Sequence, residues 1–256
     1  MDTYEKIVST WKKLYIKNSA QLEAELNGYI VKFAYHSGKI ENDAITFNDT
    51  REIFDKDGVV NYTGDLRTLF EIRNAKEASN FILESFDTHT PIDKDFVLDL
   101  QFLLTQNTYD ARRWSLGERP GTYKQHDYVT GRFEVGVYPE DVPKAMDELF
   151  EELKNTHFST PSNVLTGAAY LHAKFEQIHP FADGNGRTGR LLMNYLLLQN
   201  NHPPLIIHEE DRKLYYASLE AFDTKEDLSP LCLFLKAEVV KTFGKSRFLR
   251  KGGFYP

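Results

Sequence analysis

The chain has 256 residues, 41% of them hydrophobic and 13% aromatic, which suffices for one domain with an extension and a sizeable core. Its formal net charge of −7 excludes the broad basic footprint that general nucleic-acid binding requires. The single cysteine, Cys232, excludes an intramolecular disulfide and a multi-cysteine metal site. Neither a signal peptide nor a membrane span is visible, so we expect a cytoplasmic protein with no membrane partner.

Apolar residues at three- and four-residue steps predict a chain made mostly of amphipathic helices. The first helix carries the apolar stripe from Leu22 to Phe33 and ends at the stretch SGKIEN, residues 37–42. Later helices are predicted at 95–107, 142–155, 163–178, 190–201, 211–222 and 228–243. The stretch RLLMNYLLLQNN is almost wholly apolar, which indicates a central, buried helix.

One stretch, GTYKQHDYVTGRFEVGVYP at 121–139, has the pattern of strands. Two arms that contain Tyr, Val and Phe flank Thr130-Gly131, and this predicts a β-hairpin. Because an isolated hairpin is only marginally stable, we expect it to pack against the helices.

The stretch HPFADGNGRTGR, residues 179–190, has a composition typical of a phosphate site. Its glycines match G-x-G-x-x-G, but a dinucleotide site needs a preceding strand, and here a helix precedes. The protein-kinase version also fails, since no H-R-D or D-F-G follows. Small residues at a helix start expose backbone N–H groups to phosphate, and Arg187 and Arg190 can face the same anion. Phosphate binding is therefore favoured over a helix–helix turn with incidental arginines.

Two residues of this stretch suggest chemistry as well as binding. Asp183 beside a phosphate cradle fits Mg²⁺, which typically takes one or two carboxylates plus substrate phosphates. No spacing of ligands typical of zinc is present. His179, with an ordinary pKa near 6.5, can accept a proton at neutral pH, although a lone histidine at a helix end is more often a cap.

HPFADGNGRTGR resembles the signature H-P-F-x-x-G-N-G-R-x-x-R of the Fic family of protein adenylyltransferases, and all its fixed positions are met. The resemblance covers residues 101–236 and implies an all-α helical bundle with a small β-hairpin flap over the active site. A polar, turn-rich stretch at 47–66 indicates a mild boundary. The predicted division is an N-terminal helical arm (1–65), connecting helices (66–100), a Fic catalytic domain (101–236), and a helix end with a basic, solvated tail (237–256).

The resemblance implies a nucleotidyltransferase that moves AMP from ATP to a hydroxyl of Tyr, Thr or Ser on a protein. It assigns the base to His179, Mg²⁺ to Asp183, the anion hole to Gly184, Asn185 and Gly186, the outer phosphates to Arg187 and the γ-phosphate to Arg190. The flap, with Tyr123, Lys124, Val129 and Val135, would hold the target segment by strand pairing, unless it only covers the core. Tyr215, Tyr216 and Asp223 match the adenine side, where Asp223 replaces a usual asparagine and puts the nucleotide preference in question.

SGKIEN resembles the inhibitory motif of family members with an N-terminal inhibitory helix (class II). Ser37 and Glu41 are four apart and share a helical face, with Asn42 completing the motif. In that scheme Glu41 forms a salt bridge to Arg190, so that ATP binds with its phosphates misplaced for attack.

Several alternatives stay open at this point. The same residues would serve a de-AMPylase, a choline-type donor would fit the same motif, and a nucleotide sensor without chemistry would keep the site permanently inhibited. A DNA-binding regulator is disfavoured by the acidic charge and the lack of an appended helix-turn-helix. The resemblance also implies self-modification and a homodimer.

Overall fold

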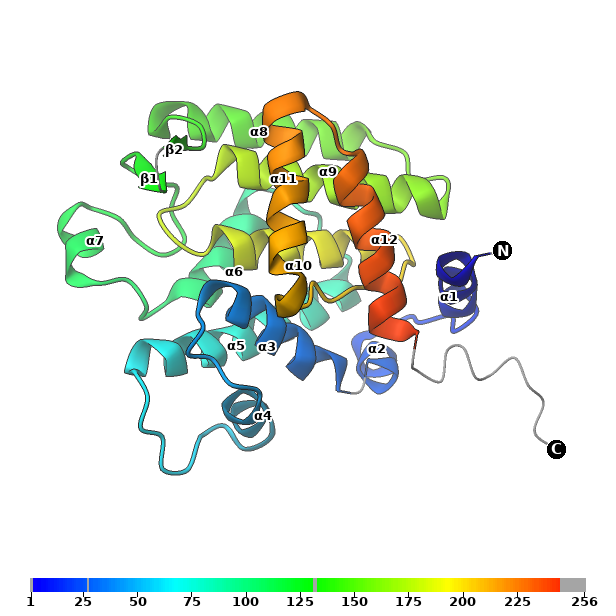
Figure 1. The fold of residues 1–256 in the computed structure, drawn as a ribbon, viewed down its shortest axis with the longest axis horizontal. Coiled ribbons are helices and arrows are strands. Elements are labelled where there is room, and N and C mark those ends of the chain that lie inside the picture. The colour runs from blue at the N-terminus through cyan, green and yellow to red at the C-terminus, as the bar shows by residue number, and fades with distance from the viewer. Residues whose placement is uncertain (1, 27, 131–132, 245–256) are drawn as a thin grey trace.

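The computed structural model describes residues 2–26, 28–130 and 133–244, with the side chains of 129–135 left undescribed. These residues form a bundle of α-helices with one short strand pair (Figure 1), and the bundle confirms the predicted helical class. The α-helices are α1 (Thr3–Lys12), α2 (Ser19–Glu25), α3 (Tyr29–Glu41), α4 (Phe47–Lys56), α5 (Leu66–Thr88), α6 (Lys94–Thr105), α7 (Ala111–Ser115), α8 (Val142–Asn155), α9 (Pro161–Ile178), α10 (Asn185–Gln199), α11 (Arg212–Lys225) and α12 (Ser229–Phe243). Short 3₁₀ turns, η1 (Pro139–Asp141) and η2 (Glu209–Asp211), precede α8 and α11. No helix in these ranges is both long and apolar enough to cross a membrane.

Helix α10 occupies the centre of the bundle, as the apolar sequence predicts. It packs on α9, α6, α5 and α3, so it is enclosed along most of its length. Its residues from Arg187 to Leu198 are all buried. The first turn of α10, which carries the end of the glycine-rich stretch, is therefore held from several sides.

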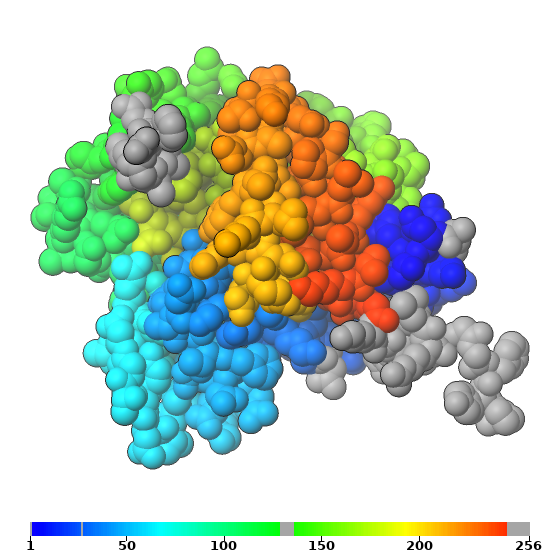
Figure 2. Space-filling model, in the orientation of Figure 1, coloured from blue at the N-terminus to red at the C-terminus, as the bar shows by residue number. Residues whose placement is uncertain are grey.

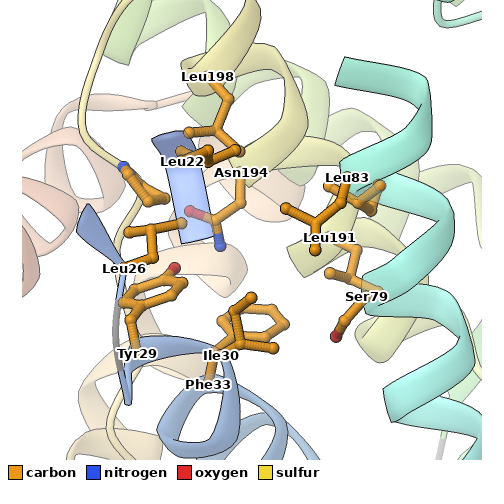
Figure 3. Close-up of a pocket in the computed structure, with 12 residues that line it drawn as sticks. Leu22, Leu26, Tyr29, Ile30, Phe33, Ser79, Leu83, Leu191, Asn194 and Leu198 are labelled. Atoms are coloured by element: carbon orange, nitrogen blue, oxygen red, sulfur yellow. The ribbon is translucent and has the colours of Figure 1, made fainter. Parts of the chain in front are cut away.

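The predicted first helix is wrong in one respect, because its apolar stripe is divided between α2 and α3. Gly28 has φ of 74° and lies directly before α3, a backbone conformation that glycine adopts without cost. One apolar pocket against α5 and α10 is still lined by all the residues of the stripe (Figure 3): Leu22, Leu26, Tyr29, Ile30 and Phe33. The periodicity therefore identified the buried face correctly, although the chain changes direction within it.

Helix α4 occupies the first half of the polar stretch at 47–66. The hydroxyl oxygen of Thr46 accepts from Asp49 N–H at 3.1 Å and caps α4, and Thr50 and Ile53 are buried. Ile53 joins Ile45 and Ile72 in a small second core beneath α3 and α5. Helix α4 buries only two side chains, so the hydrophobic pattern of the sequence did not predict it.

Strands β1 (Tyr128–Thr130) and β2 (Phe133–Val135) pair antiparallel, with Val129 opposite Glu134. Backbone hydrogen bonds join the segments that flank the pair to the end of α9. Lys124 N–H donates to Pro180 O at 2.9 Å, and Val137 N–H donates to Ile178 O at 3.0 Å. The strand pair is thus attached beside His179. The turn residue Gly131 and the basic tail from residue 245 lie outside the described residues.

Candidate active site

The stretch from His179 to Arg190 is a loop that joins α9 to α10. His179 ends α9 in the left-handed conformation (φ 52°), and Gly184 (φ 84°) precedes α10. Any other residue at position 184 would be strained, because a Cβ there would lie 2.6 Å from Thr105 Cγ2. The side-chain amide of Gln101 donates to Asp183 O at 2.9 Å, which fixes the loop to α6.

Asn185 holds the loop closed from within. Its Oδ1 accepts from Phe181 N–H at 2.9 Å, and its Nδ2 donates to Phe181 O at 2.8 Å. The amide of Asn185 is buried and bonded to the loop backbone, so it stabilises the conformation of the loop. The backbone N–H groups of the first turn of α10 remain the donors suited to an anion.

The ring of His179 is partly buried, and the segment that follows β2 lies close to this residue. Burial, and secondly the charge of Lys124, lowers the pKa of His179 to about 4. Gly136 approaches this residue so closely that a Cβ on it would lie 2.6 Å from His179 Cβ. The imidazole is consequently neutral at pH 7, which is the form that can accept a proton.

Asp183 lies among three arginines. Its Oδ2 is 2.8 Å from Arg67 Nη2 and 3.6 Å from Arg113 Nη2, and its Oδ1 is 3.1 Å from Arg187 Nη2. Glu71 extends the cluster, with its Oε1 3.1 Å from Arg67 Nε and 4.0 Å from Arg187 Nη1. The sequence gives no signal for Arg67, Glu71 or Arg113, because they come from α5 and α7 and reach the loop only in the fold.

Arg190 is fully buried and is contacted by α3. Its Nη2 is 2.8 Å from Glu41 Oε1 and also donates to Ser37 O at 2.9 Å, while its Nε donates to Ser37 Oγ at 2.9 Å. Nη1 lies 3.4 Å from the hydroxyl of Tyr215. The ion pair that the resemblance implies between Glu41 and Arg190 is thus present in the described structure.

Asn42 ends α3 directly after Glu41. Its Nδ2 donates to Glu71 Oε2 at 2.7 Å and to Thr68 Oγ1 at 3.0 Å. Its Oδ1 accepts from Ala44 N–H at 2.9 Å. The end of α3 is therefore tied to the start of α5, which fixes the position of the Glu41 carboxylate.

The tyrosines expected on the adenine side differ in environment. Tyr215 is 1% exposed, and its hydroxyl is 2.7 Å from His172 Nε2. It supports Arg190 from below and presents no surface to a base. Tyr216 is 45% exposed and Asp223 is exposed, so these two residues remain available to a ligand.

The flap residues pack inward in the part of the segment that is described. The Tyr123 ring lies 5.7 Å from that of Phe181, and Lys124 is buried. The backbone of Val129 and Val135 belongs to the strand pair, and their side chains lie outside the described residues. Tyr123 and Lys124 therefore anchor the segment to the loop.

In the space-filling view of Figure 2, the yellow-green atoms of the loop region are visible between the green segment of α7 and the strands, the orange of α11 and the blue of α3. The loop thus reaches the surface at a junction of segments that are distant in sequence.

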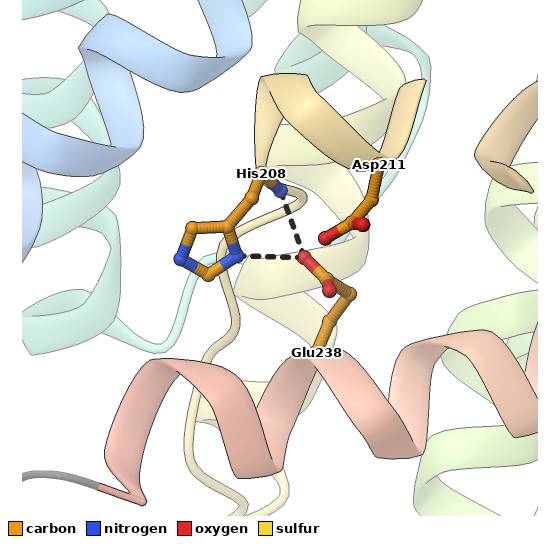
Figure 4. A group of neighbouring side chains, drawn as sticks. All are labelled: His208, Asp211 and Glu238. Atoms are coloured by element: carbon orange, nitrogen blue, oxygen red, sulfur yellow. Dashed lines mark hydrogen bonds and ion pairs between the residues drawn. The ribbon is translucent and has the colours of Figure 1, made fainter. Parts of the chain in front are cut away.

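A second cluster, of His208, Asp211 and Glu238, has ligand atoms within 4.8 Å of one another (Figure 4). Glu238 Oε2 already accepts from His208 N–H and lies 2.8 Å from His208 Nδ1. The ammonium of Lys241 pairs with Asp211. We interpret this cluster as a set of structural contacts that holds η2 against α12.

Residues 91–197 match the family model described as Fic/DOC family. The chain is 31% identical over 230 residues to "Protein adenylyltransferase Fic" of Drosophila willistoni and 27% identical over 223 residues to "Protein adenylyltransferase fic-1" of Caenorhabditis elegans. These alignments cover 88% and 86% of this chain, but 43% and 42% of the relatives, so the chain spans less than half of their length.

Solved structures agree on the fold. A Fic-domain-containing signalling protein from Bacteroides thetaiotaomicron superposes with a TM-score of 0.81 at 23% identity, over 99% of this chain and 98% of that one. Fic-1 from C. elegans superposes with a TM-score of 0.77 at 23% identity, over 98% and 72% of the two chains. Residues 91–197 therefore form a domain of the Fic/DOC family.

Proposed function

We propose that this protein transfers AMP from ATP to a hydroxyl side chain of a protein and inhibits itself through Glu41. The observation that carries the proposal is the complete loop from His179 to Arg190, placed at the start of the central helix, with its histidine neutral at pH 7. The names of the curated relatives, protein adenylyltransferases, support the same reaction.

The proposed roles are those that the family resemblance implies, and the geometry of the loop supports them. His179 accepts the proton of the attacking hydroxyl. The backbone N–H groups of Asn185 and Gly186 in the first turn of α10, together with its dipole, receive phosphate oxygens. Arg187 and Arg190 neutralise the outer phosphates, so catalysis depends mainly on positioning and charge.

The residues present fit Mg²⁺ as the metal. Asp183 supplies the carboxylate oxygens that Mg²⁺ prefers, next to the helix start where phosphates would lie. When bound, the ion would neutralise phosphate charge. In the described state both carboxylate oxygens of Asp183 contact guanidinium groups, which must give way to the metal.

Self-inhibition is supported by the engagement of Arg190. Arg190, which is proposed to bind the γ-phosphate, donates its Nε and Nη2 hydrogen bonds to Ser37 and Glu41. The Glu41 carboxylate also lies against Gly186, so closely that a Cβ there would overlap it. A negative charge therefore stands at the helix start, where it repels the outer phosphates.

The finer predictions belong to the same proposal. The strand pair would dock a target segment over His179, a position supported by the backbone bonds of Lys124 and Val137 to the end of α9. Tyr216 and Asp223 would contact the adenine base of ATP. The catalytic domain would extend over residues 101–236, and residues 1–65 would form the inhibitory arm. Self-modification, a homodimer and a cytoplasmic location are further parts of the proposal.

The test is the intact mass of the protein after incubation with ATP and Mg²⁺. We expect an AMP-sized gain for Glu41→Gly, a weak one for the wild type and none for Glu41→Gly/His179→Ala. No gain in any of the three, with ATP binding retained, would count against self-modification. The same proteins would then be offered AMP-modified targets, and release of AMP would show that the site hydrolyses the modification with water instead of transferring AMP.

A further inference from the structure

The carboxylate of Asp183 is held by arginines that the family signature does not contain. Arg67 reaches it from the first turn of α5 at 2.8 Å, and Arg113 reaches it from α7 at 3.6 Å. Both residues lie outside 179–190, and both contact the same oxygen, Oδ2. This oxygen is therefore shielded from a metal ion as long as the two guanidiniums stay in place.

The guanidinium cluster has donors that its carboxylates do not use. The Nε and Nη1 of Arg187 and the Nε of Arg113 are buried and have no hydrogen-bond partner among the described residues. An arginine keeps its charge at all accessible pH values, so it cannot reduce the cost of such donors by losing a proton. An anion with several oxygens is the chemical group that would satisfy them.

The charges of the cluster point the same way. Arg67, Arg113 and Arg187 surround Asp183, with Glu71 behind them, so three guanidiniums face two carboxylates at the loop. Asp110 also pairs with Arg113, but at the exposed edge of the cluster, where the pair is screened by water. The loop therefore retains basic character beside the start of α10.

Resting on the proposed function, we infer that Arg67 and Arg113 form a phosphate clamp that exchanges partners. Without nucleotide the clamp neutralises Asp183. With Asp183 holding Mg²⁺, the two guanidiniums would be released and would contact the phosphate oxygens of ATP, which would lie beside them at the start of α10. Arg67 is the principal member, because its contact with Asp183 is the shorter of the two and its side chain is 40% exposed.

The exchange predicts a difference between two binding constants. Without Mg²⁺, the bare carboxylate of Asp183 repels phosphates, and Arg67 is needed to shield it. With Mg²⁺, a variant without Arg67 loses a phosphate contact but no longer has to break the bond to Asp183. Removing Arg67 should therefore weaken metal-free ATP more than Mg·ATP.

The experiment measures ATP affinity by calorimetry, with and without Mg²⁺, in the His179→Ala background so that no transfer accompanies binding. For Arg67→Gln we expect metal-free ATP to weaken about tenfold and Mg·ATP about threefold or less. Arg73→Gln, an exposed arginine further along α5, is the matched control and should leave both constants unchanged. Thermal unfolding of each variant reports on folding.

Equal weakening of both constants would assign Arg67 a structural role and overturn the inference, and so would unchanged constants. Binding in this assay needs no transfer. If the binding constants contradict the clamp while AMP transfer is observed, only the inference about Arg67 fails. If the binding constants support the clamp but no transfer is observed, only the proposed function fails.

Discussion

His179 is set for proton acceptance by its surroundings rather than by its type. Burial disfavours the imidazolium, and Lys124 adds a like charge, so the pKa of His179 falls to about 4. The imidazole of His179 is therefore neutral through the whole physiological range, as the base proposed here must be. The cost is a weaker base than a solvent-exposed histidine.

The pH dependence of transfer should reflect that pKa. For Glu41→Gly, we expect kcat/KM to be level above about pH 5 and to fall below it as His179 becomes protonated. Lys124→Met should move the acid limb to higher pH, because it removes a positive charge that lowers the pKa of His179. A limb near pH 6.5 in both proteins would contradict this account.

Glu176 is a second titrating group, one turn before His179. Burial raises its pKa to about 8, and its Oε1 has no hydrogen-bond partner among the described residues. The folded protein thus keeps this proton between about pH 4.5 and 8, whereas the unfolded chain releases it. Because the folded state binds more protons, this contribution to stability is present at low pH and is lost as pH rises toward 8.

Glu176→Gln should remove that dependence, since the amide resembles the protonated acid. Relative to the wild type, its free energy of unfolding should improve between pH 5 and pH 8, by a few kcal/mol at most, because one pKa unit is worth about 1.4 kcal/mol. Urea unfolding at the two pH values measures the difference. Parallel stability curves for the two proteins would show that Glu176 titrates normally.

At the scale of elements, the strand pair depends on one close approach. A Cβ on Gly136 would lie 2.5 Å from Ile178 O and 2.6 Å from His179 Cβ, and its φ is 85°. Gly117 has nearly the same φ, 83°, but no atom lies within 4 Å of its would-be Cβ. The two glycines therefore separate backbone strain from steric overlap.

Gly136→Ala should lower both stability and AMP transfer, because the strand pair must move away from His179. Gly117→Ala should lower stability by about 1 kcal/mol, the usual cost of a left-handed alanine, with transfer unchanged. Thermal unfolding and transfer assays in the Glu41→Gly background measure both effects. Equal losses of stability and of AMP transfer in the two variants would mean that the close approach of Gly136 to His179 does not affect transfer.

At the scale of the whole molecule, α1 closes the bundle on the side away from the loop. It packs on α12, at the opposite end of the molecule from α7 and the strands (Figure 1). Trp11 is 2% exposed and lies 6.0 Å from the Phe243 ring. Helix α1 therefore contributes to the hydrophobic core of the bundle.

Trp11→Ala should reduce the free energy of unfolding by about 3–5 kcal/mol, the usual cost of truncating a buried tryptophan. Trp114→Ala makes the same chemical change on the half-exposed side of α7, where Trp114 stacks under Arg119, and should cost about 1 kcal/mol or less. Denaturant unfolding compares them. Equal losses would indicate that α1 is not docked in solution.

The sequence by itself determined the helical class, the buried central helix and the loop from His179 to Arg190. These are local properties: apolar periodicity and a contiguous set of chemical groups are readable wherever a short segment carries the whole signal. The partnership of Glu41 with Arg190 was also predictable, but only through the resemblance, since 149 positions separate the two residues.

Only the tertiary structure decided the rest. It placed Arg67, Glu71 and Arg113 around Asp183, buried Tyr215 beneath Arg190 and turned the Asn185 amide onto the loop. It also divided the first stripe at Gly28 and formed α4. Each of these depends on which surfaces of distant helices meet, and that is a property of packing, which no spacing along the chain encodes.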